Sequence, residues 1–241
     1  MLTCYTKHQL PMLEQPKTVR IRFCKKGNLQ YVSHLDLQRT IHRVLIRAGI
    51  PMWYTKGFNP HPKISYGYPL SIGTESVCEF LDIRIEREIS MENIIKQLNC
   101  ELTDEMYVYD AYEAKTDAND VAFADYTVKI CTTGGSPATA GKIAAVLSRN
   151  EVLMTKKSKS GDKEINIIPL IDQSKIGWCD ETQEIVMQLR LATGSAQNLN
   201  PELLISAAKR ECGILSGAPA AEEYSILRTH VYGADGVSEF R

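Results

Sequence analysis

Apolar and polar residues alternate over several short stretches of the chain, and a period of two predicts half-buried strands. In the first stretch, 18–24 (TVRIRFC), three apolar residues alternate with two arginines. Further strands are predicted over 51–54, 77–85 and 106–114. The segment 56–63 (KGFNPHPK) is predicted to be a rigid, irregular loop, because the prolines at 60 and 62 prevent regular pairing.

Two segments in the same half have the spacing of amphipathic helices. Ser33 is a predicted N-cap with Asp36 three residues later, apolar residues follow at helical spacing, and Gly49 ends the helix. The opposite face of this helix carries Arg39, Arg43 and Arg47 in one exposed row. A second helix is predicted from the cap at Ser90 through residue 98, so the order of elements is β-α-β-β-α-β.

The rest of the chain repeats this order. The strand at 127–134 (TVKICTTG) is similar to 18–27 (TVRIRFCKKG). It is followed by a helix at 137–149, two strands within 153–171 joined by a lysine-rich turn at 156–163, a strand at 184–191, a helix at 200–212 and a strand at 224–232. The pattern predicts an α+β fold, a tandem duplication of ferredoxin-like β-α-β-β-α-β units. The predicted organisation is an N-terminal extension (1–17), a first half (18–115), a second half (121–233) and a tail (234–241).

Charge is unevenly distributed, although the formal net charge is only -1. The segment 17–67 contains ten lysines and arginines and a single acid, Asp36, so its charge is 10 - 1 = +9 and the rest of the chain carries -10. Such a segment predicts a local positive field that attracts polyanions. The alternative is that Glu75, Glu79 and Asp82 fold against it and compensate the charge.

Cysteine usage and hydropathy argue against several classes of protein. Seven cysteines occur without a CxxC pair, which favours reduced thiols, a cytoplasmic location and no iron–sulfur or other metal site in this chain. No apolar run approaches the roughly 18 residues of a membrane span, so no membrane partner is expected. Walker, dinucleotide-binding, HExxH and GxSxG motifs are absent from the sequence.

The candidate site combines the start of the first helix with the loop at 57–63. A helix N-terminus attracts anions, and Arg39, His61 and Lys63 can surround the same anion if the loop folds back. His34, in the first turn, is the candidate catalytic residue for proton transfer; the alternative is an ordinary surface histidine.

Phe58 and Tyr66 are candidates for stacking on bases, or else core aromatics. Lysines at 156, 157, 159 and 163 suggest a second cationic finger, or else a plain hairpin tip. The predicted anion- or RNA-binding residues are Ser33, His34, Arg39, Arg43, Lys56, Phe58, Asn59, His61, Lys63, Lys156 and Lys157.

At SHLDLQR (33–39), at 47–76 and at the LD of FLDIRI (80–85), the sequence resembles the radical-SAM-linked bacterial proteins of unknown function. The resemblance continues more weakly through the lysine-rich turn and the LRT at 227–229. Residues on the family pattern are His34, Asp36, Arg39, Gly57, Phe58, Asn59, Pro60, His61, Pro62, Lys63, Gly73, Ser76 and Asp82. Such proteins are encoded beside, or fused to, radical-SAM proteins. The resemblance implies a radical-SAM partner that carries the iron–sulfur cluster and S-adenosylmethionine, with no cofactor in this chain.

Three functions fit these observations. The preferred one is an RNA-binding or substrate-presenting accessory protein for a radical-SAM enzyme in tRNA or rRNA modification. The second is a metal-independent endoribonuclease in which His34 is the general acid or base and Lys63 or Arg39 stabilises the phosphorane. The third is an adaptor whose basic face docks an acidic protein partner.

Overall fold

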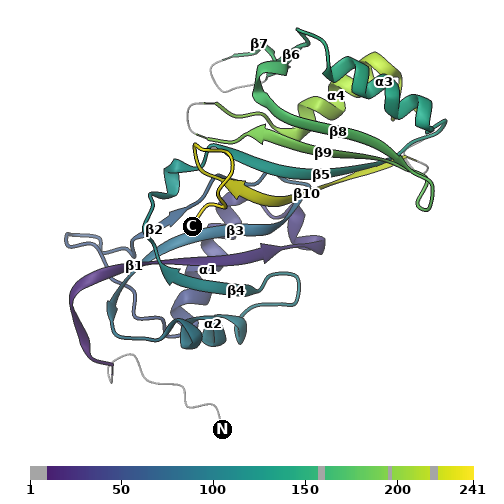
Figure 1. Cartoon of the computed structure of the whole chain (residues 1–241). Helices are drawn as coiled ribbons and strands as arrows, with labels where there is room; N and C mark the ends of the chain where they lie inside the picture. Colours follow the sequence, from purple (N-terminus) through teal and green to yellow (C-terminus); the bar gives the residue numbers. More distant parts are fainter. Residues whose placement is uncertain (1–9, 157–160, 195–196, 218–221) are drawn as a thin grey trace. The chain divides into compact units, whose positions relative to one another are not determined.

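The chain folds into two compact units in the computed structural model, Met1–Asp120 together with Arg241, and Val121–Phe240 (Figure 1). The structure describes residues 10–156, 161–194, 197–217 and 222–241. Within these residues the fold is mixed α+β, with four α-helices and antiparallel strand pairs. None of the described helices is long and apolar enough to span a membrane.

Unit 1 contains an antiparallel sheet with two helices. Its strands are β1 (Met12–Lys25), β2 (Ile64–Tyr66), β3 (Thr74–Arg87) and β4 (Val108–Glu113), in the spatial order β4-β1-β3-β2. The helices are α1 (His34–Arg47) and α2 (Met91–Asn99). β1 starts at Met12, so residues 12–17, predicted as an extension, belong to this strand, which has an irregular register between Met12 and Lys17.

The core of unit 1 lies between the sheet and the two helices. Val19, Ile21 and Phe23 of β1 lie in it, as the alternation predicted. They pack with β3 and with the apolar faces of α1 and α2, including Leu37, Leu45, Ile94 and Leu98. Arg20 and Arg22 occupy the alternate positions of β1, and they are also buried, at 0% and 5% exposure. The predicted half-buried strand is therefore buried on both sides along this stretch.

The second strand of unit 1 lies later in the chain than predicted. Residues 51–54 form only isolated bridges, Met52 with Ile85 and Tyr54 with Pro62, and the regular strand β2 follows the proline-rich loop. Pro51 has no N–H group to donate to a ladder, which limits pairing there. In β2 the alternation is clear, because Ile64 and Tyr66 pack against the core while Ser65 is exposed.

Unit 2 also has a four-stranded antiparallel sheet with two helices. Its strands are β5 (Phe123–Cys131), β8 (Ile171–Cys179), β9 (Glu184–Ala192) and β10 (Glu223–Tyr232), in the order β10-β5-β9-β8. The helices are α3 (Pro137–Leu147) and α4 (Pro201–Cys212). Between α3 and β8 lies a separate two-stranded sheet, β6 (Leu153–Lys156) with β7 (Lys163–Asn166).

β8 was not predicted from the sequence. The two strands predicted within 153–171 are the β6–β7 pair, and the strand next to β9 begins only at Ile171. β8 lies at the end of the strand order, and most of its side chains are exposed or half-buried, so its sequence lacks the apolar alternation that marks a buried strand. Lys157 and Lys159, which belong to the predicted cationic finger, lie outside the described residues.

Candidate functional site

The loop at 55–63, hereafter the Phe58 loop, is closed at its base by hydrogen bonds. The Thr55 backbone N–H donates to the His61 carbonyl at 2.9 Å, and the His61 N–H donates to Thr55 Oγ1 at 3.2 Å. The His61 ring adds a contact, because its Nδ1 lies 3.2 Å from Thr55 Oγ1 and from the Asn59 carbonyl oxygen. The base of the loop is therefore fixed, as expected for the irregular turn that its prolines predicted.

The tip of this loop exposes an aromatic ring among cations. Phe58 has a relative exposure of 107%, so it is not a core residue. Lys56 and Lys63 are also exposed, and neither forms an ion pair with any residue that the structure describes. A fully hydrated phenylalanine leaves its whole apolar surface in water, and burying that surface is worth about 2–3 kcal/mol. The tip is therefore a favourable place for a flat, anionic partner to stack.

Tyr66 has a different environment from Phe58. It is half-buried, its hydroxyl donates to the Gln38 carbonyl at 3.4 Å, and its ring meets His34 edge-on with centroids 5.6 Å apart. Burial raises the pKa of Tyr66 to about 12. Tyr66 therefore packs β2 against α1, and of the two candidate stacking residues only Phe58 faces solvent.

His34 lies against this tyrosine at the start of α1. Gln38 Nε2 donates to His34 Nε2 at 2.9 Å, which requires the unprotonated nitrogen of a neutral ring. Burial lowers the pKa of His34, the nearby Glu79 opposes that shift and Lys25 adds to it. The ring is therefore neutral at pH 7. The described partners of His34 are Gln38 and Tyr66, whereas His61 contacts Thr55 and Asn59, so the two histidines have separate partners.

Ser33 is used within the helix itself. Its Oγ accepts the Asp36 N–H at 3.2 Å and donates to Asp36 Oδ2 at 2.7 Å, which confirms the predicted cap. The Asp36 carboxylate thus lies in the first turn, where it compensates the positive end of the helix dipole. Little of that dipole remains for an external anion.

The predicted arginine row on α1 is exposed along its length. Arg47 Nε lies 2.7 Å from Glu101 Oε2 and Arg39 Nη1 lies 3.4 Å from Asp36 Oδ1, whereas Arg43 forms no ion pair with a described residue. Lys156, at the end of β6, is half-buried and donates to the Asn198 carbonyl at 3.1 Å. That lysine holds two segments of unit 2 together.

Three of the ten lysines and arginines in the segment 17–67 are buried. Arg20 Nε and Nη2 donate to the two carboxylate oxygens of Asp82 at 2.7 and 2.8 Å. The Arg22 guanidinium lies 5.5 Å from the centre of the Tyr109 ring, and Lys25, 1% exposed, donates to the Gln30 carbonyl at 3.4 Å. The segment 17–67 therefore presents less positive charge at the surface than its sequence count of +9, and Asp82, one of the three acids named in the alternative, compensates Arg20.

A polar groove of about 580 Å³ adjoins the Phe58 loop through Lys63. Lys63 and Ser65 line one part of it, Asp82 and Arg84 of β3 another, and the segment after β4, including Lys115, a third. The sequence interpretation did not include Arg84 or Lys115. The first was hidden as an ordinary polar position in the alternating strand FLDIRI, and the second lies outside the segment 17–67.

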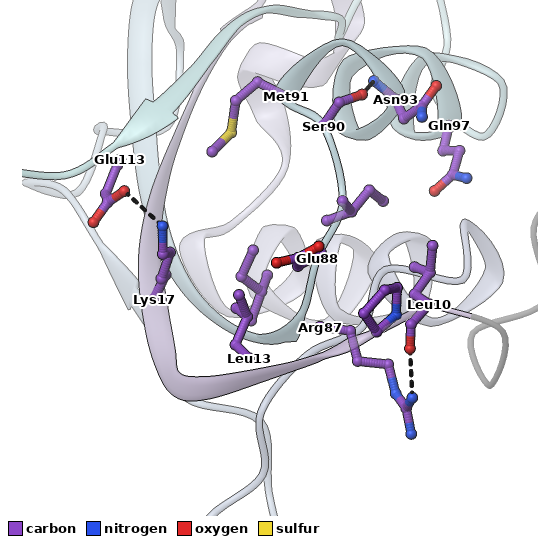
Figure 2. A pocket seen from close by; sticks show the side chains of 13 residues that line it. Leu10, Leu13, Lys17, Arg87, Glu88, Ser90, Met91, Asn93, Gln97 and Glu113 are labelled. Atoms are coloured by element: carbon purple, nitrogen blue, oxygen red, sulfur yellow. Dashed lines mark hydrogen bonds and ion pairs between the residues drawn. The ribbon is translucent and has the colours of Figure 1, made fainter.

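A second cavity of unit 1, about 590 Å³, lies where β3 ends and α2 begins (Figure 2). Leu10, Leu13 and Met91 contribute to its apolar wall, and Lys17 and Glu113 form an ion pair of 3.4 Å at its rim. None of the predicted site residues that the structure describes lines this cavity. In the described part of the chain, no three histidine, cysteine, aspartate or glutamate side chains form a metal-binding cluster.

Unit 2 has its own charged cluster, on the strands β5, β9 and β10. Arg190 donates to both carboxylate oxygens of Asp125 at 2.7 and 3.0 Å, and the Tyr232 hydroxyl donates to the same carboxylate at 2.8 Å. Burial works against ionisation of Asp125, but the hydrogen bonds from Arg190 and Tyr232 outweigh it and hold its pKa below the usual value. The residues of this cluster satisfy one another.

Three likenesses to solved structures have low TM-scores. One is to a chain of the "Cbf5-Nop10-Gar1 Complex", with 11% identity and a TM-score of 0.47, covering 88% of this chain and 48% of that chain. Others are to an "Unknown Protein from Galdieria sulphuraria" (10% identity, TM-score 0.25, 89% and 99% covered) and to "DyPB from Rhodococcus jostii RHA1" (11%, 0.19, 95% and 97%). TM-scores this low support no inference about fold or function. A search of curated proteins finds no match.

A family model gives a clearer result. The family described as "Uncharacterized protein conserved in bacteria (DUF2344)" matches residues 18–201. That span includes the Phe58 loop, the whole of α1 and all the residues that line the groove, and it extends from β1 of unit 1 to the start of α4 in unit 2. The chain therefore belongs to this bacterial DUF2344 family.

Proposed function

We propose that this protein binds single-stranded RNA through unit 1, with the Phe58 loop as the first point of contact. The observation that carries the proposal is the fully exposed Phe58 on a loop that also exposes Lys56 and Lys63, two cations without ion pairs to described residues. An aromatic ring stacks on a base while neighbouring cations neutralise phosphates, which is the usual way proteins hold single strands.

Pre-organisation supports this assignment. The Thr55–His61 hydrogen bonds hold the base of the loop in one conformation before any ligand binds. Little conformational entropy is then lost on association, so more of the stacking energy appears as affinity. The exposed Arg39 and Arg43 of α1 add positive charge that attracts RNA over a distance of about a Debye length.

Each unit is ferredoxin-like in this proposal, and the chain arose by tandem duplication. Both units have two helices and four antiparallel strands, and their strand orders, β4-β1-β3-β2 and β10-β5-β9-β8, correspond position by position. The β6–β7 pair is then an insertion before the second strand of unit 2. A ferredoxin-like plan is used by many RNA-binding modules, although a fold does not by itself specify a function.

The chemistry belongs to a partner in this proposal. The resemblance to radical-SAM-linked proteins suggests that this chain presents tRNA or rRNA, in the cytoplasm, to a radical-SAM enzyme that holds the iron–sulfur cluster and S-adenosylmethionine. Co-purification with a radical-SAM protein of the same bacterium, with iron in that protein alone, is the expected result. Iron and sulfide bound by this chain on its own would contradict this part of the proposal.

The RNA-binding part is tested by titrating labelled bacterial RNA with purified protein over a salt series. For single strands, the slope of log affinity against log salt is about −0.7 for each neutralised phosphate, so the double variant Lys56→Ala/Lys63→Ala should reduce the slope by about 1.4. The control is Lys129→Ala/Lys142→Ala, which removes two exposed lysines of unit 2. Absence of binding at low salt would refute the proposal.

The same titrations, with the labelled RNA also inspected for cleavage on a gel, distinguish the other two functions. Cleavage of RNA by the wild-type protein, lost in His34→Ala with binding retained, would indicate an endoribonuclease. The hydrogen bond between Gln38 and His34 Nε2 occupies the ring nitrogen that would accept a proton, which does not favour that function. Binding of the radical-SAM protein in place of RNA, and competition between the two, would indicate a protein adaptor.

A further inference from the structure

The groove next to the Phe58 loop has more positive than negative charge available to a ligand. Its lining includes Lys63, Arg84 and Lys115 and two acids, Asp82 and Asp117. Asp82 accepts both hydrogen bonds from the buried Arg20 guanidinium, at 2.7 and 2.8 Å. Since that pair is neutral as a whole, three cations face one remaining carboxylate.

The remaining carboxylate is also engaged. Asp117 Oδ1 accepts the backbone N–H of Asn119 at 2.9 Å and its side-chain amide at 2.8 Å. The carboxylate is thereby tied to its own turn after β4. The groove therefore presents a net positive charge, with hydroxyls of Ser65 and Thr18 on its walls as neutral hydrogen-bonding groups.

Arg84 is held in position before a ligand arrives. Its guanidinium carbon lies 5.1 Å from the centre of the Trp53 ring, and Nη2 donates to the Pro16 carbonyl at 3.4 Å. Its Nε is buried and forms no hydrogen bond with any residue that the structure describes. A guanidinium fixed in this way loses little conformational entropy when a ligand binds.

We infer that this groove is a phosphate-binding subsite, in which Arg84 and Lys115 contact one phosphate group and Lys63 connects it to the Phe58 loop. The inference rests on the proposed function and makes it more specific: a base stacks on Phe58 and the following phosphates enter the groove. Arginine suits this role because its planar fork matches the oxygens of a phosphate. The phosphate belongs either to an RNA backbone or to a free phosphorylated compound, and the chemistry of recognition is shared.

The test compares Arg84→Gln and Lys115→Ala with matched controls in unit 1. Arg87→Gln makes the same change on the same strand, but Arg87 lines the other cavity, and Lys96→Ala removes an exposed lysine of α2. Affinity for a short oligouridylate is measured by fluorescence anisotropy, and circular dichroism confirms folding. Arg84→Gln should weaken binding about tenfold to hundredfold, while Lys115→Ala should reduce the salt slope by about 0.7. The controls should bind like the wild type.

Two further ligands distinguish failure of the groove inference from failure of the RNA-binding proposal. An oligouridylate with neutral methylphosphonate linkages should lose the difference between wild type and Arg84→Gln, because no anionic phosphate remains. Binding unchanged in both groove variants but weakened in Phe58→Ala would overturn the groove inference and leave the RNA proposal intact. If RNA does not bind, inorganic pyrophosphate is titrated by calorimetry. Binding lost in Arg84→Gln would support the subsite for a free phosphorylated compound, and no binding by the wild type would refute it.

Discussion

Replacing Phe58 by alanine separates binding from folding more cleanly than any other change in the loop. The side chain has a relative exposure of 107%, so its removal loses no buried surface, and the free energy of unfolding should change by no more than about 0.5 kcal/mol. Stacking of one base on an aromatic ring is worth roughly 1–3 kcal/mol. The affinity for single-stranded RNA should therefore fall about 5-fold to 140-fold while stability stays constant.

The assay is fluorescence anisotropy with a labelled oligouridylate at fixed salt, accompanied by urea unfolding of each variant. Phe58→Trp should keep or increase the affinity, because the larger ring stacks at least as well. Tyr31→Ala is the matched control, since Tyr31 is also an exposed aromatic of unit 1, at 65%, and lies outside the loop. Equal affinity of Phe58→Ala and wild type would refute the assignment of Phe58 as a stacking platform.

Three further changes test the structural reasoning. Asp82→Ala should lower the free energy of unfolding of unit 1 by about 3–5 kcal/mol in urea unfolding, because it leaves the fully buried Arg20 without its counter-charge. If Asp82→Ala lowers the free energy of unfolding by less than Asp36→Ala does, this explanation is wrong. The pKa of Asp125 is lowered in the folded state, so its contribution to stability is present above about pH 4 and lost as pH falls below it. Chemical unfolding of Asp125→Asn should therefore show a weaker loss of stability between pH 5 and 3 than the wild type. Ser33→Ala should cost about 1 kcal/mol through loss of the α1 cap, with Ser33→Asp restoring most of it.

Local patterns predicted the elements whose signals are themselves local. The capped helix at Ser33 and the alternation of Val19, Ile21 and Phe23 depend on neighbours within a few residues, and both are confirmed. β8 and β2 were missed or displaced because each lies at the edge of its sheet. Edge strands bury few side chains, and their pairing depends on a strand far away in the sequence.

The candidate site was predicted only in part for a similar reason. Sequence marks Phe58 as aromatic and Lys25 as charged, but exposure depends on which segments cover a residue, and here the aromatic is outside and the lysine inside. Arg84 belongs to the groove because β2 and the segment after β4 lie beside its strand. No spacing within FLDIRI contains that information.

β2 has a consequence for how the protein behaves at high concentration. It is only three residues long, pairs with β3 on one side, and follows a loop with two prolines and Lys63. Short length, proline and lysine are the devices by which sheet edges avoid pairing with other molecules. Lys63, which is proposed to contact RNA, thus also opposes pairing of this sheet edge with a second molecule. Variants that neutralise Lys63 should therefore show a higher second-order aggregation rate in light scattering than variants at Lys56, whether or not RNA is present.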